Sequence, residues 1–319
     1  MANIGRNSGR KVVVVGAGNV GASFCYALAQ SGLADEIVLT DRNAELAEGQ
    51  AMDLAHGQPF FPEVEIRSGG VADYADADVI VVTAGRASKA GETRLQLLAQ
   101  NAAILSSIAG DIVAQNASGV ILVVSNPVDV LTQVALTRSG WNRGRVIGSG
   151  TVLDSARFRY LLGQHCGVDV HNVHAYMLGE HGDSEFAAWS MTHIAGMPME
   201  AYCPLCGRCK DWEDEKQKIA RSVRESAYHI IDYKGTTCYG VGMALVRIVG
   251  AILRDERSVL TVSVRLDGEF GLSGVSLSVP CIVGRRGVER VIESRLTEKE
   301  RDALNASADV LKQALAQLA

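Results

Sequence analysis

In the first half of the chain, short apolar runs alternate with longer amphipathic stretches. The runs are rich in β-branched residues and lack polar alternation, as in strands covered on both faces. They lie at residues 11–15, 36–40, 79–83, 120–124 and 145–147. The stretches between them, such as 20–30 and 95–114, carry apolar residues at helical spacing. This pattern predicts an α/β fold with a doubly wound parallel sheet.

The pattern changes after about residue 150. A helix-like stretch at 154–164 is followed by two antiparallel-looking runs at 259–266 and 275–283, and a polar helix begins at Thr297. We therefore predict a first domain over residues 1–150 and a second, α+β domain over 151–319. Because no Pro-rich linker or repeat separates them, we expect the two halves to pack tightly.

The composition is typical of a soluble globular protein. Of 319 residues, 47% are hydrophobic and 21% charged, with a formal net charge of −5. This balance argues against nucleic acid or an anionic membrane surface as a partner. The N-terminus lacks the pattern of a signal peptide, and the uninterrupted apolar runs are too short to span a bilayer. Seven cysteines, an odd number, favour reduced thiols in a cytoplasm.

A glycine motif follows the first predicted strand directly. The sequence GAGNVG lies between that strand and a helix-like stretch, the context that a dinucleotide-binding turn requires. Gly16 permits the tight turn, Gly18 lets the backbone approach a pyrophosphate, and Gly21 lets the helix lie close to the strand. Asp41, twenty residues further on, can bind a ribose diol and would repel a 2′-phosphate. We predict a Rossmann sheet that binds NAD rather than NADP.

The second half offers an acid–base pair and a cation. His181 stands between glycines in GEHGD, where a ligand can approach closely, although a single histidine is more often structural. Asp154, near the start of a helix, either stabilises that helix end or holds the His181 tautomer and raises its pKa. Arg157, three residues on, lies on the same helical face, and its planar group suits a carboxylate. These groups would serve the reduction of a 2-keto acid.

Residues 84–94 follow a strand end and contain glycine, small and basic residues before a helix. This composition is typical of a mobile lid over a site. Arg94 is the candidate for polarising a substrate carbonyl when the lid closes; the alternative is a solvated surface arginine.

Several motifs occur together in one order: GAGNVG, VLTDRN, TAG followed by GETRL, VVSNPVDV, IGSGTVLDSARFRYLLG, GEHGDSE and KGTTCYG. With them the chain resembles the L-lactate dehydrogenase branch of the lactate/malate dehydrogenase family over essentially its full length. The resemblance implies His181 as proton donor and acceptor, Asp154 as its partner, Arg157 as the clamp for the substrate carboxylate and Arg94 as the lid arginine.

The same resemblance implies further contacts. Asn126 is expected at both nicotinamide and substrate, Thr237 in the substrate pocket, and Val124 and Ser149 near the carboxamide. The predicted cofactor-binding residues are Gly16, Gly18, Asn19, Val20, Gly21, Asp41, Thr83, Gly85, Arg86, Val124, Asn126 and Ser149. The predicted substrate-binding residues are Ser88, Arg94, Asn126, Asp154, Arg157 and Thr237. No metal is expected among them.

Ser88 departs from the family pattern. Lactate dehydrogenases commonly carry glutamine at this lid position and malate dehydrogenases arginine. An uncharged residue argues against a second substrate carboxylate, although Arg86 and Lys89 lie close in sequence. A short side chain also leaves room for longer 2-keto acids. The alternatives are therefore a malate dehydrogenase, a broad L-2-hydroxy-acid dehydrogenase, or a catalytically silent NAD-binding protein, which should lack the acid–base pair.

Arg159 points away from Arg157, because two residues on an α-helix face roughly opposite directions. Bacterial lactate dehydrogenases that respond to fructose 1,6-bisphosphate carry an arginine at this position and a histidine matching His174, which bind the phosphates across a two-fold axis. The resemblance thus implies activation by this effector and a homotetramer. The alternative is that both residues serve a subunit interface only.

Three cysteines, Cys203, Cys206 and Cys209, have a spacing reminiscent of zinc or iron–sulfur ligands. No fourth ligand is visible nearby in the sequence, and the segment precedes a predicted helix at 213–232 as a surface loop. We expect free thiols or an occasional disulfide rather than a metal site.

Overall fold

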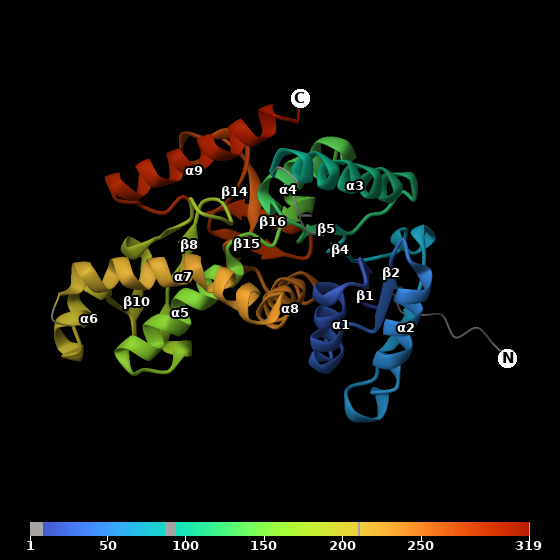
Figure 1. The fold of residues 1–319 in the computed structure, drawn as a ribbon, viewed down its shortest axis with the longest axis horizontal. Helices are drawn as coiled ribbons and strands as arrows, with labels where there is room; N and C mark the ends of the chain where they lie inside the picture. Colours follow the sequence, from blue (N-terminus) through green and yellow to red (C-terminus); the bar gives the residue numbers. More distant parts are fainter. Residues whose placement is uncertain (1–8, 87–93, 210, 319) are drawn as a thin grey trace.

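The computed structural model describes residues 9–86, 94–209 and 211–318. Its central sheet has eight strands in the order β14-β13-β6-β5-β4-β1-β2-β3 (Figure 1). The six strands of the first half are mutually parallel and comprise β1 (Lys11–Val15), β2 (Glu36–Thr40), β3 (Glu65–Ser68), β4 (Val79–Val82), β5 (Val120–Val123) and β6 (Val146–Gly148). The predicted doubly wound Rossmann sheet is confirmed. β3 was missed because its sequence EIRS is largely polar and none of its residues is fully buried.

Helices cover both faces of this sheet. They are α1 (Asn19–Ser31), α2 (Ala44–Ala55), α3 (Arg94–Ala114) and α4 (Val128–Ser139) in the first half. Alternate residues of β1 enter different cores: Val12 and Val14 pack with Phe24 of α1, whereas Val13 and Val15 belong to the cluster that contains α3 and α4. The continuous valine run of β1 is thereby explained, since both of its faces are covered.

The helix α3 is long and apolar enough, by length and composition, to cross a membrane. Sequence reasoning missed this because it considered only uninterrupted apolar runs. One face of α3 is buried against the sheet, with residues at spacings of three and four: Leu98, Ala102, Leu105, Ala109 and Ile112. Such a one-sided apolar row is typical of a core helix in a globular protein.

The second half extends the same sheet. β13 (Ser263–Asp267) pairs antiparallel with β6 and with β14 (Ser273–Ser278). β12 (Ser258–Leu260) and β15 (Cys281–Gly284) pair in a separate sheet with β16 (Gly287–Val291). The antiparallel pairing expected of the runs 259–266 and 275–283 is confirmed, and the structure adds that each run supplies two strands to two different sheets. Pro280 lies at one switch point, where its missing N–H cannot continue a ladder.

The remaining helices surround the second core. They are α5 (Val152–Cys166), α6 (Met199–Cys206), α7 (Trp212–Lys234), α8 (Tyr239–Leu253) and α9 (Glu298–Ala316), and short strands β7 (Val173–His174), β8 (Met177–Leu178), β9 (Phe186–Ala187), β10 (His193–Ile194) and β11 (Met197–Pro198) lie between α5 and α6. Thr297 caps α9 as expected, with its hydroxyl accepting from the Glu300 N–H at 3.3 Å.

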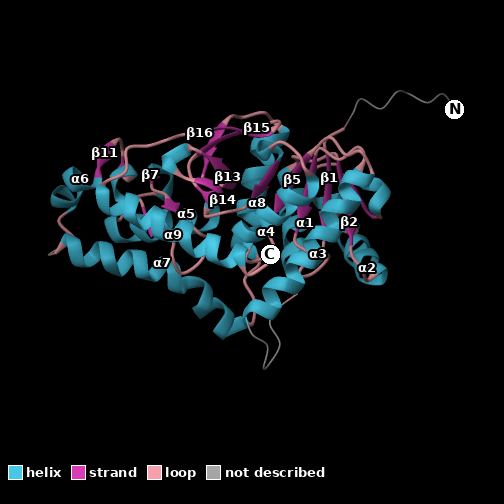
Figure 2. Cartoon of the chain, turned by 90° about the horizontal axis from the view of Figure 1, so that it is seen from above, coloured by secondary structure: helices cyan, strands magenta, loops and turns pink. Residues whose placement is uncertain are grey.

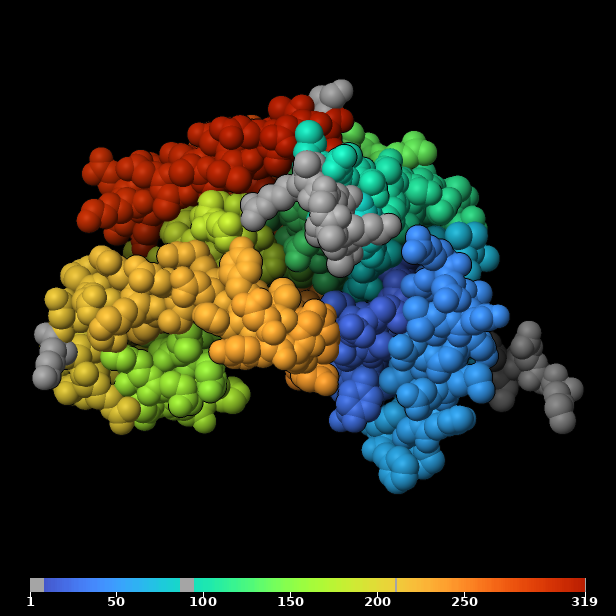
Figure 3. Space-filling view, in the orientation of Figure 1, coloured from blue at the N-terminus to red at the C-terminus, as the bar shows by residue number. Residues whose placement is uncertain are grey.

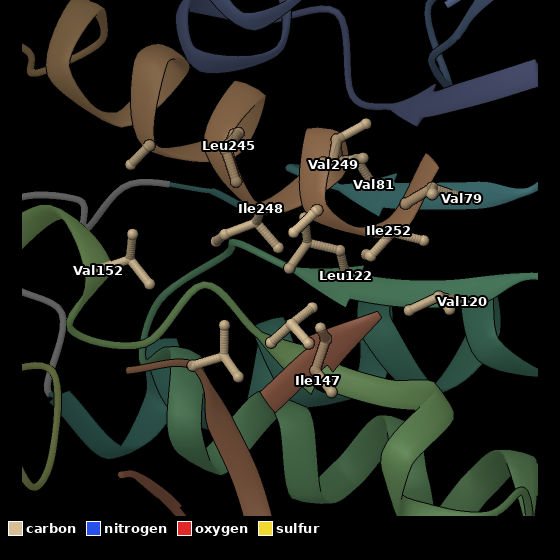
Figure 4. Packing of buried hydrophobic residues seen from close by; sticks show 14 of the residues in the cluster. Val79, Val81, Val120, Leu122, Ile147, Val152, Leu245, Ile248, Val249 and Ile252 are labelled. Carbon is tan, nitrogen blue, oxygen red and sulfur yellow. The ribbon is translucent and has the colours of Figure 1, made fainter. Parts of the chain in front are cut away.

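The helix α8 joins the two halves. Leu245, Ile248, Val249 and Ile252 pack over the apolar residues of β4, β5 and β6 (Figure 4). A Cβ at Gly242 would lie 3.3 Å from the Ser23 carbonyl oxygen, so α8 and α1 approach each other closely. The space-filling view shows the two halves side by side (Figure 3), as the lack of a linker predicted.

Candidate active site

The glycine turn after β1 is shaped by its neighbours. Gly16 has a φ of +112°, and a Cβ there would lie 2.7 Å from the Ala84 backbone nitrogen. A Cβ at Gly21 would lie 1.9 Å from the Gly16 carbonyl oxygen, so only glycine fits where α1 meets the turn. By contrast, a Cβ at Gly18, which precedes α1, would meet nothing within 4 Å. The turn is therefore closed on the protein side and open at the helix N-terminus, as binding of a pyrophosphate requires.

Asp41 and Thr83 hold this turn. One oxygen of Asp41 accepts from the Ala17 N–H at 2.8 Å and the other from the Asn43 N–H at 2.9 Å. The Thr83 hydroxyl donates to the Gly16 carbonyl at 2.9 Å. Asn19 and Val20 form the first turn of α1 beside it. A carboxylate fixed at this position has lone pairs left for a ribose diol, so the residues fit an NAD molecule.

Five more predicted cofactor residues follow the carboxyl ends of neighbouring parallel strands: Gly85 and Arg86 after β4, Val124 and Asn126 after β5, and Ser149 after β6. Asn101 of α3 ties two of these loops together. Its side chain accepts from the Arg86 N–H at 3.0 Å and donates to the Asn126 carbonyl at 3.1 Å. This edge is where ligands of open α/β sheets bind.

Asp154 connects a histidine and an arginine. Its Oδ2 lies 2.6 Å from Nδ1 of His181, and its Oδ1 accepts from an Nη of Arg157 at 2.6 Å. Asp154 sits in the first turn of α5 and is 2% exposed, whereas the His181 side chain is 25% exposed. The structure thus brings together the three residues that we singled out, with Nδ1 of His181 as the ring atom that contacts Asp154.

Charge balance decides the protonation of this pair. Burial alone lowers the pKa of His181, but the charge of Asp154 and its hydrogen bond outweigh burial and raise that pKa to about 9. Burial alone would raise the pKa of Asp154, but His181 and Arg157 together keep it below its ordinary value. At neutral pH the two form an imidazolium–carboxylate pair, with a proton ready for transfer.

Two buried acids near this pair were missed by sequence reasoning. Asp129, the second residue of α4, accepts from the His181 N–H at 2.8 Å and from the Ser278 hydroxyl at 3.3 Å. Burial raises its pKa to about 6. Glu185 is 4% exposed and lies within 4.8 Å of the ligand atoms of Asp154 and His181. The sequence did offer a signal for each acid, because Asp129 lies among apolar residues in NPVDV and Glu185 lies in the motif GEHGDSE.

Glu185 differs in charge state from Asp154. Burial, reinforced by the negative charge of Asp154, raises the pKa of Glu185 to about 9. Its carboxyl group is therefore neutral at pH 7 and adds no charge next to the Asp154 carboxylate.

Of the other predicted substrate residues, the structure describes the side chain of only one of the following three. Ser88 lies outside the described residues. Arg94 is the first residue of α3, and its side chain lies outside the description. Thr237 lies in the turn between α7 and α8, half-buried, on a different element from the acid–base pair.

Arg159 and His174 lie on one surface region. Arg159 donates from Nε to the Val173 carbonyl at 2.9 Å, and His174 is the next residue, exposed in β7. Arg157, two residues earlier on α5, contacts Asp154 instead. The two arginines thus face different surroundings, as the helical periodicity predicts.

Comparisons with known proteins agree over the whole chain. The family model of the lactate/malate dehydrogenase NAD binding domain matches residues 10–148, and the model of the alpha/beta C-terminal domain of the same family matches residues 151–319. The chain is 62% identical over 310 residues to an L-lactate dehydrogenase of Treponema denticola, covering 97% of this chain and 98% of that one. It is 48% identical over 308 residues to the L-lactate dehydrogenase of Thermoanaerobacter pseudethanolicus, covering 97% and 99%.

Solved structures give the same picture. A lactate dehydrogenase from a Medee basin deep-sea metagenome library has a TM-score of 0.95 at 43% identity, covering 97% of this chain and 98% of that one. The minor L-lactate dehydrogenase of Enterococcus mundtii, in its ligands-bound form, has a TM-score of 0.95 at 42% identity, covering 98% and 99%.

Proposed function

Because this chain belongs to the lactate/malate dehydrogenase family, we propose that it is an NAD-dependent L-lactate dehydrogenase that interconverts pyruvate and (S)-lactate. The curated relatives named above are L-lactate dehydrogenases. The observation that carries the proposal is the bond from the His181 N–H to Asp129, three residues after Asn126. It anchors the acid–base pair beside the loop that follows β5, at the sheet edge where the glycine turn also lies.

When bound, NADH supplies the hydride that reduces C2 of the keto acid. His181 holds the proton on Nε2 and gives it to the carbonyl oxygen, while Asp154 fixes the other ring nitrogen and stabilises the imidazolium. Arg157 uses one Nη for Asp154 and presents its remaining N–H groups to the substrate carboxylate. Arg94 polarises the carbonyl from the start of α3. In the reverse direction a neutral His181 accepts the hydroxyl proton.

The two buried acids support this work without touching the substrate. Asp129 fixes the backbone of His181, so the ring enters the site in one orientation. Glu185, held neutral, adds no charge beside Asp154. The charge of Asp154 keeps the pKa of His181 above neutrality, which favours proton donation to pyruvate.

A substrate panel tests the proposal. With NADH, we expect kcat/KM for pyruvate to exceed that for oxaloacetate, because Ser88 offers no charge to a second carboxylate, and 2-ketoisocaproate to be accepted less well than pyruvate. We expect NADPH to be a poor substitute, since Asp41 repels its extra phosphate. A preference for oxaloacetate would instead support a malate dehydrogenase, and equal rates would support a broad 2-hydroxy-acid dehydrogenase.

We further propose activation by fructose 1,6-bisphosphate in a cytoplasmic homotetramer. Arg159 and His174 are neighbours on one surface, and an isologous interface would gather two of each around one bisphosphate. Pyruvate saturation curves with and without the effector should differ for the wild type and coincide for Arg159→Gln. Coincident curves for the wild type would reject activation, and light scattering behind a sizing column would test the tetramer.

A further inference from the structure

Three thiols gather where α6 ends. The Sγ atoms of Cys203, Cys206 and Cys209 all lie within 4.8 Å of one another. Cys203 and Cys206 belong to the last turns of α6, three residues apart. Gly207 ends the helix in the left-handed region, with a φ of +65°, and the chain reverses so that Cys209 returns to the other two. The spacing and this turn together place three soft ligands around one point.

A fourth thiol comes from another helix. Cys166 is the last residue of α5, is 5% exposed, and belongs to the same buried cluster as Cys203, against which Cys209 also packs. It precedes Cys203 by 37 residues. Sequence reasoning found no fourth ligand because it searched nearby positions, whereas the fold brings one from a different element.

Polar side chains of neighbouring residues lie beside the thiols. Nε2 of His165 lies 2.8 Å from Sγ of Cys209, and its Nδ1 lies 3.8 Å from a carboxylate oxygen of Glu215. Arg208 donates to the His165 carbonyl at 3.4 Å, which places a guanidinium beside the cluster. A polar group in contact with a ligand atom orients that ligand and tunes the metal, and His165 has this position beside Cys209.

We propose that Cys166, Cys203, Cys206 and Cys209 bind one Zn²⁺ in a tetrahedral site. On binding, each thiol that becomes a ligand releases its proton, so four thiols and one cation give a tetrathiolate complex and four protons. The Zn–S bond of about 2.3 Å places neighbouring sulfurs roughly 3.8 Å apart in a tetrahedron. Three sulfurs already within 4.8 Å of one another fit that size, and Cys166, in the same buried cluster as Cys203, supplies the fourth.

An iron–sulfur cluster fits the cysteine cluster less well. The C-x₂-C-x₂-C spacing also occurs in ferredoxins. A cubane, however, places iron and sulfide between its cysteines and needs a wider ligand set than this one. Single-ion coordination is therefore the better match to the positions of the thiols.

The zinc site ties elements together rather than taking part in the reaction. It joins the end of α5 to α6 and to the segment before α7, where Trp212 packs edge-on against Trp189 and Trp189 against Phe158 of α5. Cys166 is twelve residues from Asp154 on α5, about 18 Å along the helix. Figures 1 and 2 both show α6 at the end of the molecule opposite α2. We expect the metal to stabilise this outer end of the second half.

Metal analysis of the full-length protein, purified without a histidine tag from zinc-supplemented cultures, tests the site. Elemental analysis should give one zinc per chain for the wild type and almost none for Cys206→Ser or Cys166→Ser. Cys281→Ser is the matched control, because Cys281 is buried elsewhere and its thiol donates to the Val279 carbonyl at 3.2 Å, a bond that serine retains. It should keep the zinc. His165→Gln should keep it too, since His165 contacts a ligand and is not one.

Several results would overturn the proposal. One is a wild type that takes up no zinc even after reduction and incubation with zinc chloride. Others are a wild type that contains iron instead of zinc, or one whose mass is lowered by a disulfide. Full zinc content in both Cys206→Ser and Cys166→Ser would also contradict the site. Zinc retained by Cys166→Ser but lost from His165→Gln would refute the ligand set.

Two further measurements concern the metal in the wild type. Cobalt exchanged into the protein should give the charge-transfer absorption of a tetrahedral thiolate site, and a spectrum without it would contradict four sulfur ligands. A chelator should lower the unfolding temperature of the wild type by several degrees and leave that of Cys206→Ser unchanged. An unchanged midpoint in a wild type shown to have lost its zinc would contradict the stabilising role.

Discussion

The two ends of α5 carry two clusters of similar ligand content and different chemistry. At the first turn, Asp154 lies close to His181 and Glu185. At the last residue, Cys166 belongs to the buried cluster that holds Cys203, whose thiol lies close to those of Cys206 and Cys209. In each cluster at least three side chains that could hold a metal lie within 4.8 Å of one another. The clusters differ in ligand type, with oxygen and nitrogen atoms at the first turn and sulfur atoms at the other end, and in the charges of their neighbours.

At the first turn, protein groups already balance the charge. Arg157 and the imidazolium of His181 face the Asp154 carboxylate, and Glu185 remains protonated. At the other end, the thiols contact mainly one another, and a divalent cation would turn them into thiolates. The comparison teaches that the available counter-charges, rather than the number of ligand atoms, separate a proton-transfer site from a metal site.

Replacing the histidine should have the largest effect on the first cluster. His181→Asn removes the proton donor but keeps a polar side chain of similar reach, so we expect kcat to fall by about 10² or more. NADH binding, followed by its fluorescence, should be retained because the glycine turn is untouched. Near-normal turnover would remove His181 from the mechanism.

A smaller but still large effect is expected at the arginine. Arg157→Lys keeps the charge and loses the planar group that serves Asp154 and a carboxylate together. Loss of charge-assisted hydrogen bonds of about 1.5–3 kcal/mol predicts a roughly 10- to 100-fold lower kcat/KM for pyruvate. Arg159→Lys, two residues away, is the matched control and should change basal kcat/KM little. Equal losses in both variants would argue for a general effect on α5.

The charge state of Glu185 can be tested by a substitution that keeps the side chain neutral. Glu185→Gln replaces a neutral acid with a neutral amide of the same shape, so we expect kcat to change less than about threefold near pH 7. Steady-state kinetics measure this directly. A loss of the size seen for His181→Asn would show that Glu185 is ionised or exchanges a proton during turnover.

The smallest effect is expected when a residue at one end of α5 is replaced and the property of the other end is measured. Cys206→Ser should change kcat less than about twofold at moderate temperature, because the cysteine cluster lies far from the substrate. His181→Asn should conversely leave the zinc content unchanged. A variant that disturbs both readouts would show that the two ends are coupled and break the comparison.

Much of the fold was predictable because its signals are local. The glycine turn, the valine-rich strand β1 and the cap at Thr297 each depend on residues within a few positions, and so does the proximity of Asp154 to Arg157. The edge strand β3 was missed because half-exposed strands lack a continuous apolar run. The division of residues 259–266 between two sheets was missed because pairing partners are remote in sequence.

The missed site residues share a physical cause. Asp129 and Glu185 became recognisable only when their burial and their distance to His181 were known, since an acid in a motif is usually solvated. Cys166 and Cys203 lie 37 residues apart in the sequence and share one buried cluster only in the folded chain. Such contacts depend on tertiary structure, and no spacing rule reports them.

The most direct test of the account concerns the proton held between His181 and Asp154. The pH dependence of pyruvate reduction and lactate oxidation should be measured for the wild type and for Asp154→Asn. Because the pKa of His181 is raised to about 9, wild-type reduction should fall and oxidation should rise as the pH increases through that value. In Asp154→Asn the negative charge that raises this pKa is absent. The midpoints of both pH profiles should therefore move toward the ordinary histidine pKa of about 6.5. Midpoints that are the same in Asp154→Asn as in the wild type would contradict the imidazolium–carboxylate pair.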